Sequence, residues 1–308
     1  MKSKFFKNNN LILICGPTAV GKSDLASQIA KTINGEIINA DSMQVYKYFN
    51  ILTSQPSILQ KKNANHHLYS YVDVNKKFSA AQWLKDANIA IEKILKKEKT
   101  PIVVGGSGLY TEFLLNGINL IPKISSEVRK KIEQDINKYG LEILYRQLLK
   151  IDPNYALKIS SNDRQRIVRS LEVYYQTKSK FSDFHSKKKI KNRYKAFKVL
   201  LLPDRKLIRK NCATRFEKMI ANGLIDEVAQ YRKLVSNSNI SNAIGYSEIC
   251  RFLNKEMSLK EATNLAIIKT RRYSKRQSTW FRNRLKIDLL LNSREDTSLV
   301  VESFSKII

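Results

Sequence analysis

Cysteine is scarce in this chain of 308 residues, which has only Cys15, Cys212 and Cys250. The three are far apart, odd in number and without the spacing of metal ligands. The sequence therefore predicts neither a disulfide framework nor a zinc site. We expect a protein of the reducing cytoplasm.

Long apolar runs are also missing. No stretch approaches the roughly 20 apolar residues of a membrane span. After the basic residues 1–10 only five apolar residues follow, which is too short for the core of a signal peptide. We expect no membrane segment and no membrane partner.

Acidic residues are few, since 27 Asp and Glu stand against 56 Lys and Arg, giving a formal net charge of +29. Such an excess indicates a polyanionic partner, nucleic acid before membrane. A genome rich in Lys, Asn and Ile codons would produce a similar composition, so the charge alone does not decide. With 43% hydrophobic residues, the chain can form one large core or two domains.

The most informative motif lies between an apolar run at 11–15 and a helical pattern at 24–32, and it reads Gly16-Pro17-Thr18-Ala19-Val20-Gly21-Lys22-Ser23. Strand, glycine loop and helix in this order are the arrangement of a P-loop. Its N–H groups and the helix N-terminus converge on a di- or triphosphate. Lys22 is predicted to reach the outer phosphates and the Ser23 hydroxyl to bind Mg²⁺.

Two further apolar stretches, 36–40 and 101–104, are predicted to be strands of the same parallel sheet. Ligands bind at the carboxyl ends of such strands, so Asp41 is a candidate general base beside the P-loop. An Asp that caps the next turn is an equal alternative. After the second strand, Gly105-Gly106-Ser107-Gly108 either approaches a ligand, with Ser107 as a hydrogen-bonding group, or forms a tight turn. No acidic residue ends this strand to hold Mg²⁺ as in P-loop ATPases, which argues against ATP hydrolysis.

A different pattern fills residues 118–195, where helical stretches succeed one another with no strand between them. We expect an all-helical insertion there, and an α/β core with helices around a parallel sheet from residues 1–117 and 196–308. Within the insertion, Gln165, Arg166 and Arg169 cluster on one predicted helix, as an RNA-binding face or as a solvated charged face. Residues 178–191 are expected to form a strongly basic loop.

The stretch 269–284 interleaves basic residues with aromatic ones, which suits phosphate contacts and base stacking. Trp280 within it is nevertheless expected to pack inward, and Trp83 to lie in the core. The adjacent pair His66 and His67 is predicted to be a loop without a metal role, because no third ligand lies at a useful spacing.

Eight blocks follow one another in an order that is far more specific than any one of them. They are GPTAVGKSDLA from Gly16, ADSMQVY from Ala40, HHL from His66, GGSGLY from Gly105, NDRQRIVRSLE from Asn162, RFEKM from Arg215, AIGYSE from Ala243 and TRRYSKRQSTWFR from Thr270. Together they resemble the tRNA dimethylallyltransferase family, also called tRNA isopentenyltransferases, over nearly the whole chain.

The resemblance implies a P-loop NTPase-like fold with a helical insertion that grips the anticodon stem-loop of tRNA. It implies transfer of a dimethylallyl group from dimethylallyl diphosphate to the exocyclic N6 amine of the adenine next to the anticodon on its 3′ side. The tRNAs concerned are expected to be those that read codons starting with U. Mg²⁺ is the implied cofactor, ATP is not a substrate, and we expect a cytoplasmic monomer.

The resemblance also assigns roles to residues. Asp41 is the implied base, Lys22 and Ser23 act with it, and Arg215 joins the P-loop in diphosphate binding, with Arg209 as the alternative. Gln55 and Asn211 stand where relatives are often basic. The positions that match tRNA contacts are Asp41, Ser42, Met43, Gln44, Ser107, Arg129, Gln165, Arg166, Ile167, Val168, Arg169 and Gly245.

Three rival functions are compatible with a P-loop. An adenylate dimethylallyltransferase would perform the same chemistry on a free nucleotide, although the insertion, the block from Ala243 and the net charge disfavour it. A small-molecule kinase would transfer phosphate from ATP without any tRNA. A non-catalytic nucleic-acid-binding NTPase module would not require Asp41.

Overall fold

The computed structural model describes residues 10–119, 121–186, 194–236 and 238–306. The chain divides into two compact units, one formed by Met1–Leu115 with Arg193–Ile308 and the other by Asn116–Asn192. Residues 1–9 of the basic N-terminus and 187–191 of the expected basic loop lie outside the described residues.

The first unit is built on a parallel sheet in which the described strands have the order β3-β2-β4-β1-β5-β6. β1 and β4 are buried along their whole length, as expected for strands covered on both faces. The predicted α/β class with a P-loop NTPase-like parallel sheet is confirmed. The strands are β1 (Asn10–Cys15), β2 (Gly35–Asn39), β3 (His66–His67), β4 (Thr100–Gly105), β5 (Lys195–Leu201) and β6 (Leu289–Leu291).

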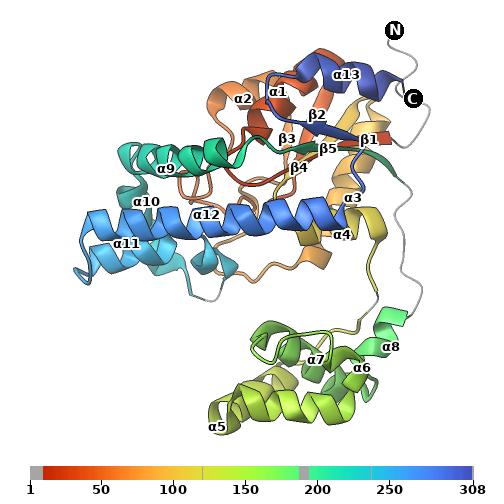
Figure 1. Ribbon diagram of the computed structural model, residues 1–308, viewed down its shortest axis with the longest axis vertical. Coiled ribbons are helices and arrows are strands. Elements are labelled where there is room, and N and C mark those ends of the chain that lie inside the picture. The colour runs from red at the N-terminus through yellow and green to blue at the C-terminus, as the bar shows by residue number, and fades with distance from the viewer. Residues whose placement is uncertain (1–9, 120, 187–193, 237, 307–308) are drawn as a thin grey trace. The chain divides into compact units, whose positions relative to one another are not determined.

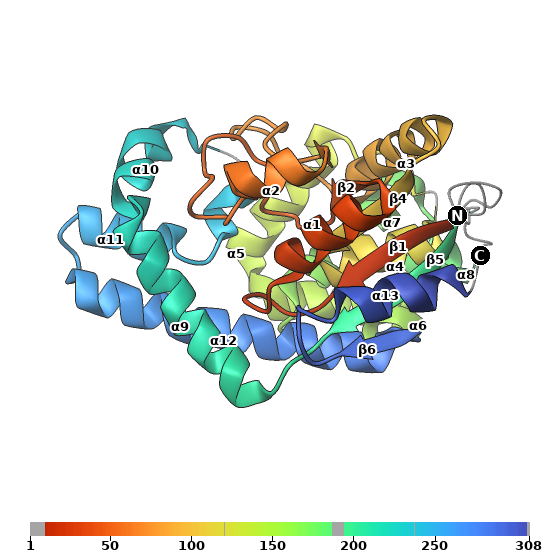
Figure 2. The same ribbon diagram turned by 90° about the horizontal axis from the view of Figure 1, so that it is seen from above.

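Helices cover both faces of this sheet. Figure 1 shows α1 and α13 above it and α4 and α12 below it. Figure 2 shows α9, α10 and α11 toward one end, and α12 runs from that end along the unit; these helices pack against one another. The helices that begin in this unit are α1 (Lys22–Ile33), α2 (Ile58–Asn63), α3 (Ala80–Lys96), α4 (Gly108–Asn116), α9 (Arg205–Ala221), α10 (Leu224–Tyr231), α11 (Tyr246–Leu253), α12 (Leu259–Arg284) and α13 (Thr297–Ser305).

Trp83 on α3 is fully buried, as predicted, and it supports the end of β2. Its ring stacks on Tyr110 of α4 with centroids 4.4 Å apart. Its indole N–H donates to the backbone oxygen of Asn39, two residues before Asp41, at 2.7 Å. A core residue therefore fixes the backbone that carries the candidate base.

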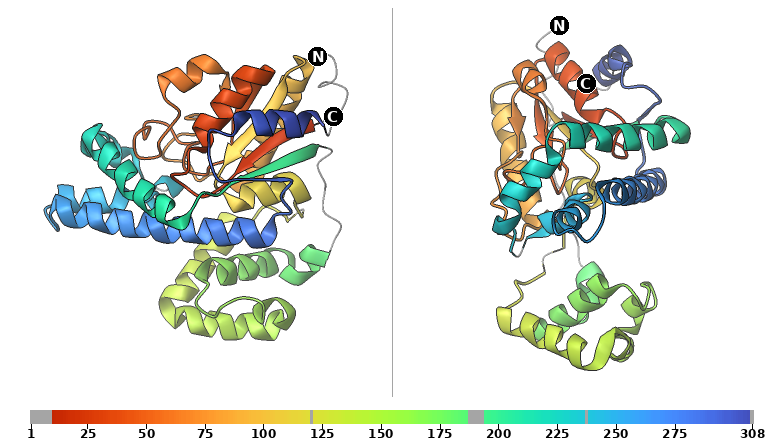
Figure 3. Two further views of the ribbon diagram at one scale, coloured as in Figure 1. Left: turned by 45° about the horizontal axis from the view of Figure 1, so that its top comes forward. Right: turned by 90° about the vertical axis from the view of Figure 1, so that its left-hand side faces the viewer.

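The second unit consists of α5 (Ser126–Ile151), α6 (Pro153–Ala156), α7 (Arg164–Thr177) and α8 (Phe181–Ser186), and Figure 3 shows these helices packed on one another. α5 is kinked at Gly140, whose φ of 79° is not helical, so two helical segments meet at this glycine. Asp163 caps α7 by accepting the N–H of Arg166. The loop predicted for 178–191 is wrong over α8, because Phe181 and Phe184 anchor a helix in a small core.

Ile167, one of the positions matched to tRNA contacts, faces the interior of the second unit. Its side chain is fully buried in the core of the second unit together with Leu144, Leu148 and Leu171. The physical reason is helical periodicity, since Ile167 and Leu171 are four apart and share the inner face of α7. Val168 packs partly against the same core.

Membrane-spanning helices were not expected, and in the described part of the chain no helix has both the length and the apolar character to cross a bilayer.

The pair His66 and His67 forms β3, not a loop, and His67 is engaged by a buried carboxylate. Glu36 on β2 is 1% exposed, and its two oxygens lie 2.7 Å from His67 Nε2 and 2.8 Å from Lys99 Nζ. Burial alone would raise the pKa of Glu36, but hydrogen bonds from Lys99, His67 and Asn65 outweigh it and lower the pKa to about 2.

We predict that Glu36→Gln lowers the free energy of unfolding by about 3 kcal/mol at pH 7. This value follows from the pKa of Glu36, which is lowered from 4.5 to about 2 in the folded protein. Because the folded pKa is depressed, this contribution is complete above the ordinary pKa of a glutamate and is lost as the pH falls toward 2. Urea unfolding of both proteins at pH 7 and pH 3 measures it. Glu98→Gln, at an exposed position, is the control; equal losses in the two variants would contradict the prediction.

Candidate functional site

The P-loop follows β1 and leads directly into α1. Gly21 has a φ of 89° and precedes α1, whose first turn has no side-chain cap. Such a conformation favours glycine, and the uncapped N–H groups are left available to an anion. The loop therefore has the geometry of a phosphate cradle.

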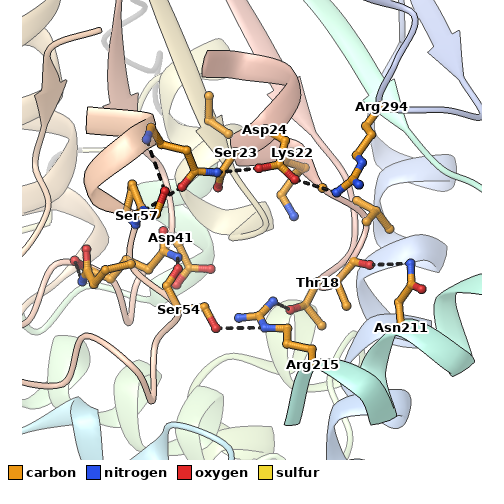
Figure 4. A pocket seen from close by; sticks show the side chains of 18 of the residues that line it. Thr18, Lys22, Ser23, Asp24, Asp41, Ser54, Ser57, Asn211, Arg215 and Arg294 are labelled. Atoms are coloured by element: carbon orange, nitrogen blue, oxygen red, sulfur yellow. Dashed lines mark hydrogen bonds and ion pairs between the residues drawn. The ribbon is translucent and has the colours of Figure 1, made fainter. Parts of the chain in front are cut away.

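Thr18 in this loop is held from two distant parts of the chain, of which Figure 4 shows the contact with Arg215. Arg215 on α9 donates from Nη1 to the Thr18 hydroxyl at 2.6 Å and from Nε to the Ser54 hydroxyl at 2.9 Å. The Thr18 N–H donates to Oε1 of Gln277 on α12 at 2.9 Å. A guanidinium and an amide from the C-terminal half of the chain thus fix the shape of the loop.

Gln277 was not among the predicted site residues. It is buried, and its Nε2 also donates to the backbone oxygen of Gly106 at 2.8 Å, so one side chain ties the P-loop to the glycine turn after β4. The one feature of the sequence that could have drawn attention to Gln277 is its uncharged amide within the basic stretch 269–284. Its role could not be inferred from spacing, because Gln277 and Thr18 are 259 positions apart.

Lys22 lies at the start of α1, and its ammonium group donates to the backbone oxygen of Pro17 at 2.6 Å. Burial lowers the pKa of Lys22 to about 8; Asp41 opposes the shift and the charge of Arg215 adds to it. Without an anion, two cations thus face each other across the loop. A bound diphosphate would relieve this repulsion.

Asp41 lies at the carboxyl end of β2 and lines the same cavity as the P-loop (Figure 4). One of its oxygens, Oδ1, accepts the N–H of Met43 at 2.8 Å. This is the turn-capping role that we considered as an alternative, and it does not exclude the other. The carboxylate is held by the turn while it still faces the cavity.

The glycine turn after β4 supports the Asp41 loop more than it offers a ligand contact. A side chain at Gly105 would collide with the backbone oxygen of Ala40. Ser107 is buried, and its hydroxyl accepts the N–H of Ser42 at 3.0 Å and lies 3.3 Å from the Ser42 hydroxyl. The close contact that requires glycine at position 105 is thus made with the protein's own backbone at Ala40.

The two departures from the family pattern have local partners. Asn211 donates from Nδ2 to the backbone oxygen of Ala19 in the P-loop at 3.1 Å. Gln55 donates to the backbone oxygen of Gln44 at 2.7 Å. Of the two alternatives for diphosphate binding, Arg215 lines the cavity, whereas the backbone of Arg209 accepts a bond from Arg271.

These groups surround one cavity of about 1030 Å³. The predicted residues that line it are Thr18, Ala19, Val20, Gly21, Lys22, Ser23, Asp41, Gln44 and Arg215. Within the described ranges no group of three or more His, Cys, Asp or Glu could hold a metal ion by itself. A metal at this site would therefore need oxygen atoms of a bound phosphate.

The remaining residues matched to tRNA contacts have different surroundings. Gln165 and Arg166 on α7 are exposed, and Arg129 and Arg169 lie 3.9 and 3.3 Å from Glu172. Gly245, also matched to a tRNA contact, is buried against Phe216 and Leu52 and immediately precedes α11.

Trp280 rests its ring against Gly108 and is half-buried, so the expected inward packing is only partial.

A P-loop at the carboxyl end of a parallel sheet, with Lys22, Arg215 and a carboxylate around one cavity, defines a P-loop protein that binds a phosphorylated substrate. The model of the family described as IPP transferase matches residues 44–284. The chain therefore belongs to the IPP transferase family.

Known proteins match this chain over most of their length. The chain is 44% identical over 282 residues to the tRNA dimethylallyltransferase of Pelagibacter ubique (strain HTCC1062), covering 91% of this chain and 90% of that protein. It is similar to the tRNA isopentenylpyrophosphate transferase structure from Bacillus halodurans, with 31% identity, a TM-score of 0.70 and coverage of 97% and 95%. A eukaryotic dimethylallyltransferase acting on tRNA gives 27% identity and a TM-score of 0.83, with coverage of 97% and 79%.

We predict that diphosphate binding takes up a proton above about pH 8. The pKa of Lys22 is about 8 in the free protein, and the bound anion must raise it. Affinity is therefore highest below this pH and falls by up to about tenfold per unit above it. Calorimetry with inorganic diphosphate at pH 7 and 9, in buffers of different ionisation enthalpy, counts the protons.

Lys22→Arg is the matched control, because guanidinium stays charged throughout. Equal proton uptake in the two proteins would show that Lys22 does not titrate with binding.

Proposed function

We propose that this protein transfers a dimethylallyl group from dimethylallyl diphosphate to the N6 amine of the adenine on the 3′ side of the anticodon in tRNA. The observation that carries the proposal is the single cavity in which Lys22, Arg215 and Asp41 meet. Cations for a diphosphate and a carboxylate for an amine are the groups that this reaction needs. The relatives named above supply the substrate class.

The diphosphate is the leaving group, and the P-loop stabilises its charge. The N–H groups of the loop, Lys22 and Arg215 bind its oxygens, which weakens the bond to the allylic carbon. Thr18, fixed by Arg215 and Gln277, keeps the loop in the shape that receives it.

The donor set fits Mg²⁺. The Ser23 hydroxyl lines the cavity and has no hydrogen-bond partner among the described residues, and Asp41 contributes a carboxylate to the same space. Hard oxygen ligands with most positions left to water and phosphate suit this ion. Ser23 would hold the ion, which supplies charge neutralisation of the diphosphate when bound.

Asp41 accepts a proton from the adenine amine as the new C–N bond forms. The amine is a weak nucleophile because its lone pair is delocalised into the ring, so a positioned base contributes. The cavity lies within the first unit, and the base must leave its stack to enter it.

The tRNA is bound by basic surfaces. Arg129, Gln165, Arg166 and Arg169 of the second unit are proposed to contact the anticodon stem-loop, and Ser42 to Gln44 the target nucleotide. The net charge of +29 supports a polyanionic partner. We place the protein in the cytoplasm, as a monomer.

The test is incubation with Mg²⁺, radiolabelled dimethylallyl diphosphate and either unmodified tRNA or AMP. We expect label in tRNA alone. Label in AMP would assign the protein to nucleotide-level chemistry, and label in neither would remove the proposal.

We predict that Asp41→Asn slows transfer by roughly 10²- to 10⁴-fold and leaves tRNA affinity nearly unchanged. Asparagine can still accept the N–H of Met43, so the turn is kept. Single-turnover rates and filter binding separate the two effects. Asp24→Asn is the control, because this carboxylate lines the same cavity but is bonded to Gln60 and Arg294. Near-normal transfer by Asp41→Asn would exclude Asp41 as the base.

We predict that Arg166→Ala weakens tRNA binding and reduces the salt dependence of log K by about 0.7 to 0.9. The Arg166 side chain is 61% exposed beside Asp163, so its loss does not disturb the core. Binding titrations from low to moderate salt measure the slope. Arg146→Ala, an exposed arginine on α5 paired with Glu142, is the control. An unchanged salt dependence for Arg166→Ala would show that this charged face of α7 is solvated and does not contact tRNA.

A further inference from the structure

The loop that follows β3 carries backbone strain on both sides of Tyr69. Leu68 and Ser70 have φ angles of 64° and 47°, in the left-handed region that residues with side chains rarely adopt. Such conformations persist only where the surrounding structure enforces them, and they concentrate at functional sites. Tyr69, held between them, lines the cavity that contains the P-loop and Asp41.

A buried amide enforces this conformation and joins the Tyr69 loop to the Asp41 loop. Asn39 is fully buried. Its Nδ2 donates to the backbone oxygens of Leu68 and Asp41, both at 3.0 Å, and its Oδ1 accepts the N–H of Asp41 at 2.8 Å. The N–H of Ser70 also donates to the backbone oxygen of Gln44 at 3.0 Å. Tyr69 and Asp41 are therefore positioned as one unit.

The Tyr69 hydroxyl is a free donor in this arrangement. No group among the described residues forms a hydrogen bond with it. Burial and the neighbouring charge of Asp41 both raise the pKa of Tyr69, so the phenol stays protonated at working pH. An ionised carboxylate, by contrast, can only accept. The cavity thus presents one acceptor and one donor on loops that Asn39 holds together.

Adenine presents the complementary pair on either side of C6. Its exocyclic amine donates, and the ring nitrogens N1 and N7 beside that amine accept. We propose that Asp41 and Tyr69 read this edge together, Asp41 accepting from the N6 amine and the Tyr69 hydroxyl donating to the adjacent ring nitrogen. The inference rests on the proposed function and assigns to Tyr69 a role in recognising the target base.

This pairing has consequences for selectivity and for the reaction. Guanine would place its O6 carbonyl against the Asp41 carboxylate, leaving two acceptors opposed and unpaired. A hydrogen bond to the ring nitrogen also draws electron density from the amine and makes its protons easier to remove. Asp41 takes that proton as the C–N bond forms, and the C–O bond breaks to release diphosphate.

The test compares wild-type protein and Tyr69→Phe on anticodon stem-loops that carry adenosine, 1-deazaadenosine or 7-deazaadenosine at the target position. We expect the wild type to lose roughly tenfold in kcat/KM on one of the two analogues, the size of one hydrogen bond. Tyr69→Phe should lose a similar factor in kcat/KM on adenosine. On the analogue that impairs the wild type, the variant should have the same kcat/KM as the wild type. The analogue concerned identifies N1 or N7.

The assignment would be overturned if the loss from Tyr69→Phe added to the loss from removing the ring nitrogen on both analogues. Full activity of Tyr69→Phe on adenosine would also overturn it. A wild-type protein that transfers nothing to the unmodified stem-loop would instead refute the proposed function itself.

Tyr71→Phe is the matched control, because Tyr71 belongs to the same loop as Tyr69 but its hydroxyl donates to Oδ2 of Asp86 on α3 at 2.8 Å. We expect this variant to have a lower Tm and unchanged discrimination between adenosine and its analogues. Tyr69→Phe should keep the wild-type Tm, since its hydroxyl has no partner in the described protein. A lower Tm with equal losses on all three substrates would give Tyr69 a structural role and overturn the proposal.

Discussion

The hydrogen bonds that hold Thr18 are the interaction on which the candidate site depends. Arg215 binds its hydroxyl and Gln277 its N–H, and these two residues come from α9 and α12. A glycine loop on its own has many conformations, so its N–H groups converge on a phosphate only when the loop is fixed. The C-terminal helices supply this constraint and are therefore part of the phosphate site.

Electrostatic balance is the second property of the cavity. Lys22 and Arg215 share the cavity with the Asp41 carboxylate, and the depressed pKa of Lys22 reflects the cost of burying its charge. An incoming diphosphate offsets this cost. The same cavity is thereby prepared for an anionic leaving group and for removal of a proton from a neutral amine, which are the two demands of the proposed reaction.

Much of the fold could be predicted from the sequence because its signals are local. The P-loop, the strands around 11–15 and 101–104 and the helices of the second unit are each encoded in a few adjacent residues. The errors arose where tertiary contacts decide the outcome. Phe181 and Phe184 stabilise a helix where charge predicted a loop, and Glu36 holds His67 in a strand.

The sequence by itself determined the P-loop, the parallel α/β class and the place of Asp41 at a strand end, because each follows from local pattern and from the topology of parallel sheets. Only the tertiary structure decided that Arg215 and not Arg209 enters the cavity, that Gln277 joins two loops, and that Asn39 places Tyr69 beside Asp41. The physical reason is that these are side-chain contacts between residues far apart in the chain. No local pattern specifies such pairs before the helices and the sheet have packed.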